Sequence, residues 1–258
     1  MSDWNAALYR RFEDQRTRPA ADLLARIPEM TPALVVDLGC GPGNSTELLV
    51  RRFADATVIG LDSSPDMLAD ARRRLPDCRF IEADIATWQP EAAPDLIFAN
   101  ASLQWLGDHH SLFPRLFALL APGGVLAVQM PDNAGEPTHR LMREIAAQDP
   151  WADLIGNADR IRTVREDPPA YYAMLAGSAA AVDLWRTTYH HPMDSADDIV
   201  GWVQGTGLRP FLNLLPEDMR PSFLSCYRDR IDGAYPPFPD GRRLLAFPRL
   251  FIVARRPA

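Results

Sequence analysis

Asp37 ends a short apolar run and is followed by Gly39, Gly41 and Gly43 in the pattern acid-x-Gly-x-Gly-x-Gly. Glycine has no Cβ and takes positive φ readily, so alternating glycines let the backbone pass close beneath a flat ligand. A carboxylate at the end of a strand faces the crevice in which open α/β sheets bind ligands. The stretch predicts a strand, a tight ligand-binding turn and the start of a helix. A glycine-rich turn without a ligand is the simpler alternative.

The spacing of the glycines discriminates between two kinds of cofactor. A dinucleotide fingerprint, G-x-G-x-x-G, would require a third glycine at position 44, where this chain has Asn44. Asp62 ends a second apolar run, 19 residues beyond Gly43. This is close to the offset at which nucleotide-binding folds place a carboxylate on ribose hydroxyls. The pattern favours a ribose-containing ligand and disfavours a nicotinamide dinucleotide.

The acid and the alternating glycines resemble motif I of the class I S-adenosylmethionine-dependent methyltransferases. In that family the loop wraps the methionine part of the cofactor, and the acid binds its ammonium group directly or through water. The resemblance implies S-adenosylmethionine as cofactor and S-adenosylhomocysteine as product. It assigns cofactor binding to Asp37, Gly39, Gly41, Gly43, Asn44, Asp62, Ser63, Met67, Asp84, Ile85 and Asn100.

Some members of this set have structural alternatives. Asp84 follows a third apolar run, and the resemblance implies that it accepts from the adenine amino group while the backbone near Ile85 serves the ring. An Asp before a loop is also a common turn cap. Ser63 and Ser64 are suited to capping the next helix. Met67 in that helix would face either the adenine or the core.

The composition is ordinary for a soluble globular protein, with 258 residues, 47% of them hydrophobic and 24% charged. The net charge of −7 disfavours nucleic acid as a partner, because phosphate neutralisation needs clustered Lys and Arg. No stretch is long enough to cross a bilayer, and the start lacks a signal-peptide pattern, so we expect a cytoplasmic protein. A monomer is compatible with the sequence. The three cysteines are too few for a disulfide framework, and no metal-ligand spacing is found.

Apolar runs alternate with helical periodicity along the first half of the chain. Strands are expected at 35–38, 56–62, 79–85, 95–100 and 125–130. Helical segments between them indicate a parallel sheet with right-handed crossovers. Further helices are expected over 4–30 with a break at Pro19, 45–53, 137–147, 169–175, near 195 and 216–232, and further strands over 182–190 and 249–254.

These elements predict an α/β, Rossmann-like methyltransferase fold. We expect a mostly parallel seven-stranded sheet with helices on both faces and a helical cap. The chain is expected to form a single domain over 1–258. Within it, N-terminal lid helices occupy 1–30, the cofactor-binding core 31–131 and the cap about 193–244.

Several stretches beyond the glycine loop carry a more specific resemblance. They are residues 2–5, 16–20, 98–105, 128–133, 185–189, 206–210 and 247–256. Together with the loop they resemble the trans-aconitate 2-methyltransferase family over nearly the full length. The resemblance implies methyl transfer to one carboxylate of trans-aconitate, a small-molecule tricarboxylate, giving a monomethyl ester. The segment 149–167 is not matched.

A carboxylate acceptor has a reference pKa of about 4 and is ionised at pH 7, so no catalytic general base is needed. Catalysis would then consist of orienting a carboxylate oxygen toward the methyl group. A tricarboxylate also needs cationic and hydrogen-bonding partners in a site that excludes water. Candidate substrate-binding residues are Arg209, Gln104, Trp105, Arg18, Tyr9, Tyr171, Tyr189 and His191.

These candidates differ in what supports them. Arg209 lies between Gly207 and Pro210, and a rigid loop would favour a fixed guanidinium fork. Tyr189 and His191 alternate by two and would share a face of a strand. Each side chain has a structural alternative in packing or local hydrogen bonding. For Trp105 the choice is between a cation–π wall for the sulfonium and a core position.

Other functions remain open at this point. A phenol or amine acceptor would need a base near residues 100–105, where only His109 and His110 are close in sequence. Another small acid could replace trans-aconitate. A protein that binds S-adenosylmethionine without transferring its methyl group would keep the same three acids. A dehydrogenase is disfavoured by Asn44.

Overall fold

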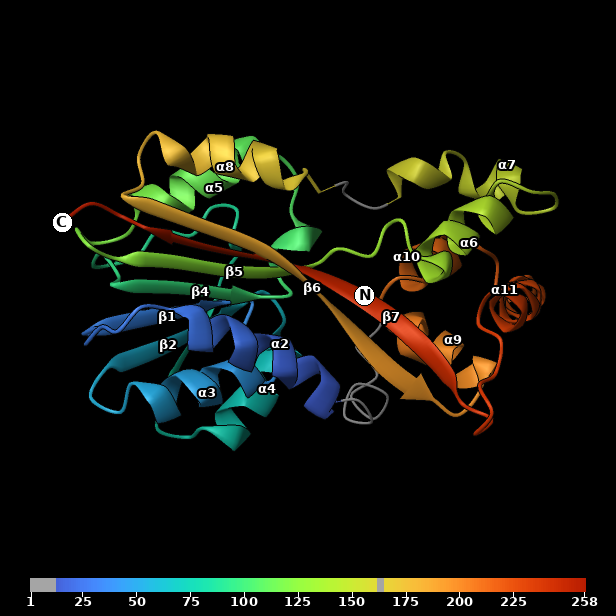
Figure 1. Ribbon diagram of the computed structural model, residues 1–258, viewed down its shortest axis with the longest axis horizontal. Helices are drawn as coiled ribbons and strands as arrows, with labels where there is room; N and C mark the ends of the chain where they lie inside the picture. The colour runs from blue at the N-terminus through green and yellow to red at the C-terminus, as the bar shows by residue number, and fades with distance from the viewer. Residues whose placement is uncertain (1–12, 162–164) are drawn as a thin grey trace. The chain divides into compact units, whose positions relative to one another are not determined.

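A computed structural model describes residues 13–161 and 165–258 of the chain. Its strands form a seven-stranded sheet in the order β3-β2-β1-β4-β5-β7-β6. Figure 1 shows β2, β1, β4 and β5 side by side in this order. Strands β1 to β5 are parallel, and β7 is antiparallel to β5. The bounds are β1 Leu34–Leu38, β2 Thr57–Asp62, β3 Arg79–Glu82, β4 Leu96–Asn100, β5 Val125–Pro131, β6 Ala181–Met193 and β7 Arg243–Arg255.

Helices connect most of these strands and fill the second half of the chain. The α-helices are α2 Glu13–Arg26, α3 Asn44–Arg52, α4 Pro65–Arg74, α5 His109–Ala118, α6 Pro137–Ala146, α7 Ala152–Ile155, α8 Pro168–Ala176, α9 Ala196–Gln204, α10 Arg209–Leu214 and α11 Arg220–Ala234. Two 3₁₀ turns, η1 Leu103–Trp105 and η2 Ala158–Arg160, complete the elements described. The predicted Rossmann-like fold is confirmed.

Contacts between residues divide the chain into two compact units. The sheet unit comprises 16–131, 165–187 and 249–258. The helical unit comprises the described residues among 1–15, 132–164 and 188–248. The predicted cofactor-binding core falls within the first unit and the predicted cap segment within the second.

The two faces of the sheet unit are set by strand alternation. Val36, Ile97, Leu126 and Ile252 point to one side, where they pack with α5 and α8 in one buried cluster. Helices α2, α3 and α4 lie on the other side of β1 and β2 (Figure 1). Strand order reverses between β1 and β4, which creates the switch point at which such sheets bind ligands.

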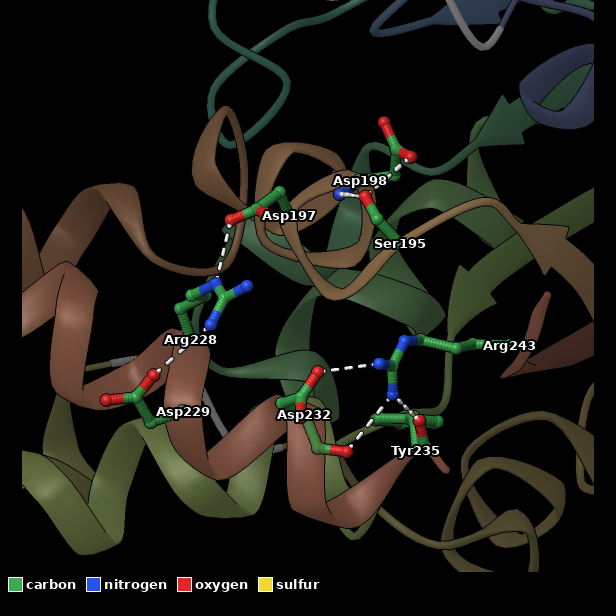
Figure 2. Close-up of polar contacts among 8 residues, drawn as sticks. All are labelled: Ser195, Asp197, Asp198, Arg228, Asp229, Asp232, Tyr235 and Arg243. Atoms are coloured by element: carbon green, nitrogen blue, oxygen red, sulfur yellow. Dashed lines mark hydrogen bonds and ion pairs between the residues drawn. The ribbon is translucent and has the colours of Figure 1, made fainter. Parts of the chain in front are cut away.

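The helical unit has its own core, in which α11 packs against α6 and α9. Tyr227 donates from its hydroxyl to the carbonyl of Thr138 at 2.9 Å, which ties α11 to α6. Figure 2 shows ion pairs that fix the ends of these helices. Arg243 donates to the carboxylate of Asp232 at 2.6 Å, and Arg228 to that of Asp197 at 3.1 Å.

Several predicted boundaries are wrong. Helix α2 runs through Pro19 without the expected break. No helix joins β3 to β4, where Pro90 and Pro94 disfavour one. Strand β7 begins at Arg243 rather than at 249. The prediction began the strand after Pro248, because a proline normally argues against a strand.

The cap segment also differs in detail. Helix α11 begins at Arg220 rather than Pro216, and the short helix α10 was predicted as a loop. Arg209 is therefore the first residue of α10 and not part of a rigid loop, because Pro210 occupies the first helical turn, where proline is well tolerated.

Candidate cofactor and acceptor site

The glycine loop follows β1 as predicted and has left-handed backbone at all three glycines. Their φ angles are 69° at Gly39, 54° at Gly41 and 91° at Gly43. A Cβ on Gly39 would lie 2.3 Å from the Cβ of Ser102, closer than any real contact. Among the described residues, no atom lies within 4 Å of a Cβ placed on Gly41. Packing therefore requires a glycine at position 39, whereas backbone conformation alone requires one at 41.

Asp37 lies fully buried beneath this loop, 0% exposed. Its Oδ2 accepts from the hydroxyls of Ser45 and Thr46, both at 2.7 Å, in the first turn of α3. Its Oδ1 is buried without a hydrogen-bond partner among the described residues. Burial raises the pKa of Asp37 to about 6, against the two hydroxyl hydrogen bonds, which lower it. The carboxylate thus keeps one acceptor atom for a cationic ligand group while it anchors α3.

Asp62, at the end of β2, organises the two segments around it. Its Oδ2 accepts from the backbone N–H of Gly41 at 2.9 Å, and its Oδ1 from that of Ser64 at 2.9 Å. Each carboxylate oxygen has a second lone pair. Asp62 can therefore hold the glycine loop and still accept from a hydroxyl pair. The predicted cap of α4 is confirmed, since Ser64 accepts from the N–H of Met67.

The loop after β3 carries Asp84 and Ile85. Asp84 caps the turn by accepting from the N–H of Ala86 at 2.8 Å, and it is exposed. Arg115 of α5 donates to the carbonyls of Ile85 and Trp88 at 2.5 and 2.9 Å, which fixes the loop. The turn-cap alternative for Asp84 is thus observed, and its role toward adenine stays a prediction.

The chain turns sharply after β4, at Ala101, whose φ of 54° is unusual for a residue with a Cβ. Asn100, just before it, has a buried Oδ1 without a partner among the described residues. Gln104 is buried and donates its amide N–H to the carbonyl of Ala101 at 2.6 Å, so the alternative of a loop amide satisfying backbone is observed. Trp105 is 45% exposed, which excludes the core alternative for it.

Three of the predicted cofactor-binding segments meet at the carboxyl ends of β1, β2 and β4. The first is the glycine loop with Asp37, the second is Asp62, and the third is Asn100. Asn44 begins α3, Ser63 is exposed beside Asp62, and Met67 is half-buried in α4. These groups fit S-adenosylmethionine. Buried acceptor atoms on Asp37 and Asn100 suit a cationic ligand, and the glycine loop lets the backbone lie close to it.

The predicted substrate residues of the sheet unit are not all suited to a pocket. Arg18 projects from α2 with its side chain largely exposed and lies 4.0 Å from Asp22. Tyr171 is 0% exposed, and its hydroxyl lies 2.6 Å from Nδ1 of His109. Burial lowers the pKa of His109, whose other ring nitrogen lies 2.9 Å from the carbonyl of Leu103. This pair ties α8 to α5, so nothing here supports a substrate role for Tyr171.

Three other candidates belong to the helical unit. Strand β6 reaches Met193, so Tyr189 and His191 do share a face, and their rings stack at 6.4 Å. His191 also stacks on Trp202 at 4.8 Å, and both candidates are buried. Arg209 is half-buried at the start of α10. Tyr9 lies outside the described residues.

Sequence reasoning missed four polar residues near this edge of the sheet. Ser45 and Thr46 lie eight and nine residues beyond Asp37, a spacing that places them in the first turn of α3. Gln129 and Arg249 are buried polar residues inside apolar strands. A polar side chain inside a mostly apolar strand was the available signal for the last two.

No helix among the described residues is both long and apolar enough to span a membrane. Within residues 13–161 and 165–258 no cluster of His, Cys, Asp and Glu side chains is suited to holding a metal ion.

Comparison with solved structures agrees with this fold. The YcgJ protein from Bacillus subtilis is similar with a TM-score of 0.60 at 12% identity, covering 93% of this chain and 99% of that chain. The phosphoethanolamine N-methyltransferase 2 of Haemonchus contortus, solved with S-adenosylhomocysteine, gives a TM-score of 0.55 at 16% identity, covering 93% and 53%. Residues 35–124 match the family model described as a methyltransferase domain.

Curated relatives are similar over the whole chain. A trans-aconitate 2-methyltransferase of Methylobacterium radiotolerans is 65% identical over 259 aligned residues, covering 99% of both chains. One of Variovorax paradoxus is 63% identical and covers 100% of both. One of Yersinia pestis is 58% identical and covers 98% of both. With the glycine loop, Asp37 and Asp62 placed as this fold requires, the chain belongs to the trans-aconitate 2-methyltransferase family of S-adenosylmethionine-dependent methyltransferases.

Proposed function

We propose that the protein transfers a methyl group from S-adenosylmethionine to one carboxylate of trans-aconitate, forming a monomethyl ester. The observation that carries the proposal is the identity of 63–65% over full length to relatives with that name. The buried acceptors beneath the glycine loop support the same cofactor.

The cofactor supplies an electrophilic methyl group on its sulfonium when bound. The chain contributes the groups that hold it. Asp37 offers its Oδ1 to the ammonium group, and Asp62 offers the remaining lone pairs of its carboxylate to the ribose. The left-handed glycines let the backbone lie against the ligand without a side chain intervening.

The acceptor carboxylate needs orientation rather than activation. It is ionised at neutral pH, and orienting it can supply up to about 7–11 kcal/mol. His109 is unsuitable as a base, because both of its ring nitrogens already have hydrogen-bond partners in the interior. We therefore assign no general base to this reaction.

Acceptor-binding residues remain proposals. Arg209, Tyr189 and His191 are retained from the helical unit. Trp105 is retained from η1, the turn after β4, where its exposed ring can lie against a sulfonium. Arg18 is retained as a basic residue on α2. We further propose that the protein is a cytoplasmic monomer acting on a small molecule and not on nucleic acid, as its net charge of −7 suggests.

The test is transfer of radiolabelled methyl to a panel of trans-aconitate, cis-aconitate, citrate and isocitrate. We expect an ester of trans-aconitate at the highest kcat/KM. A higher kcat/KM for another acid would keep carboxyl methylation and replace the acceptor. Tight cofactor binding without product from any acid would reject the proposed reaction and favour a protein that binds the cofactor without using it.

A further inference from the structure

Gln129 and Arg249 form a buried pair on neighbouring strands. Gln129 of β5 is 0% exposed and Arg249 of β7 is 5% exposed. The guanidinium donates from Nη1 to Oε1 of Gln129 at 3.5 Å. In the strand register Gln129 pairs with Asn100 on one side and with Phe251 on the other, and Arg249 lies two residues before Phe251. All four side chains therefore share one face, opposite the α5 and α8 cluster.

The chemistry of the pair identifies which amide atom of Gln129 is left without a partner. A guanidinium has donors only, so the amide atom next to Arg249 must be the oxygen of Gln129. The other amide atom is then Nε2, a donor, and it is buried without a partner among the described residues. Leaving a buried donor unsatisfied costs about 1–3 kcal/mol. An acceptor placed against Nε2 would remove that cost.

The position of the pair suits an acceptor molecule next to the cofactor. Asp37 pairs in register with Phe98 of β4, so Asp37, Asn100, Gln129 and Arg249 lie along the same face at the carboxyl ends of β1, β4 and β5. With strands about 4.8 Å apart, Gln129 is one strand from Asn100 and Arg249 two. Both members of the pair belong to the sheet unit, as do the cofactor-binding candidates.

An apolar surface lies beside the pair. Phe251, opposite Gln129, stacks on Trp185 of β6 at 4.8 Å with an interplanar angle of 8°. Aromatic surface on this side lowers the local dielectric, and hydrogen bonds from a guanidinium to an anion are stronger there than in water.

We propose that Arg249 and Gln129 bind a carboxylate of the acceptor acid. Arginine has five N–H donors, so it can hold Gln129 and still form a fork with a carboxylate. Nε2 of Gln129 would donate to the same carboxylate. This assignment rests on the proposed carboxyl methylation and adds to it a specific anchor that the polyanionic substrate requires.

The decisive variant is Gln129→Glu, which places a carboxylate of the same shape against Arg249. The built-in carboxylate competes with the acceptor's own, so we expect kcat/KM for trans-aconitate to fall about 100-fold or more, mainly through KM. Thermal stability should be kept, because the substituted side chain has the same shape and still places an oxygen against the guanidinium of Arg249. Calorimetric affinity for S-adenosylhomocysteine should stay within about twofold.

Two further variants support the comparison. Arg249→Lys keeps the charge and loses the fork, so KM for the acid should rise while cofactor affinity persists. Arg255→Met, on the same strand but exposed, is the matched control and should leave KM unchanged. An unchanged KM in both Gln129→Glu and Arg249→Lys would overturn the assignment.

A second readout separates failure of the proposed methyl transfer from failure of the proposed carboxylate anchor. If the wild-type protein forms no ester, calorimetric binding of trans-aconitate to the protein loaded with S-adenosylhomocysteine becomes the readout. Binding that both variants lose, and Arg255→Met keeps, supports the anchor even without turnover. Equal binding by the variants, or none by the wild type, overturns it.

Discussion

Asp37 meets two opposed requirements in one side chain. It is fully buried, which favours the protonated form, whereas its proposed contact with an ammonium group requires the ionised form. The hydroxyls of Ser45 and Thr46 offset part of the burial, yet the pKa remains raised to about 6. The unliganded protein therefore carries a destabilising charge at neutral pH that cofactor binding would neutralise.

Asp37→Asn should stabilise the unliganded protein above pH 6 and weaken cofactor binding. The native carboxylate holds a proton between about pH 4 and 6 that the unfolded chain has released, so wild-type stability falls as pH rises through that window, by about 3 kcal/mol. The variant should lack this slope. Urea unfolding at several pH values measures it, and calorimetry measures the lost cofactor affinity. Identical slopes in the two proteins would exclude the raised pKa.

Asp62→Ala should weaken cofactor binding by about 1–3 kcal/mol, because both the ribose acceptor and the hydrogen bond to Gly41 are lost. Calorimetry with S-adenosylhomocysteine measures the change. Asp77→Ala, an exposed acid in the loop before β3, is the control. Unchanged affinity in Asp62→Ala would remove Asp62 from the site.

At the scale of the element, the turn from β1 into α3 is held by hydrogen bonds to β2 and by contact with the segment after β4. Its N–H groups at 39 and 40 donate to the carbonyl of Leu61, at 2.7 and 2.9 Å. Ser102, after β4, donates to the carbonyl of Leu38 at 2.7 Å and occupies the space that a side chain at Gly39 would need. Residues at the carboxyl ends of β1, β2 and β4 thus define one loop conformation.

Gly39→Ala and Gly41→Ala separate backbone conformation from packing. Both residues have positive φ, but only a Cβ at Gly39 meets Ser102. Gly41→Ala should cost about 1–2 kcal/mol from left-handed backbone alone. Gly39→Ala should cost clearly more and abolish cofactor binding. Chemical denaturation measures both variants, and equal losses would show that the contact with Ser102 is relieved at little cost.

At the scale of the whole molecule, two strands contribute to both compact units. Strand β6 has residues on each side of the division at 187/188, and β7 on each side of that at 248/249. Each unit also has its own buried cluster, so neither depends on the other for a core.

We expect a single unfolding transition despite the two clusters, because neither strand can be lost from one unit without disrupting the other. Calorimetry should give equal calorimetric and van't Hoff enthalpies. Ile252→Ala in the sheet unit and Ile199→Ala in the helical unit, each fully buried, should lower the midpoint of that one transition. Two resolved transitions, each sensitive to one variant, would contradict this expectation.

The sequence by itself determined the sheet, the glycine loop and the family. Apolar strands that end in an acid, such as those closed by Asp37 and Asp62, follow from local patterning, which is visible in one dimension. The cap of α4 by Ser64 was likewise predictable, because it depends on residues three apart. The segment around α10 was not, since six residues give too short a periodicity to recognise.

Only the tertiary structure decided which polar side chains come together at the carboxyl edge of the sheet. Tyr171 was a candidate substrate-binding residue from the sequence, yet it packs against His109 in the interior. Gln129 and Arg249 lie 120 residues apart in the chain and meet only because β7 inserts antiparallel beside β5. Strand order and register are set by long-range pairing, and the local pattern of residues carries no record of which strands will be neighbours.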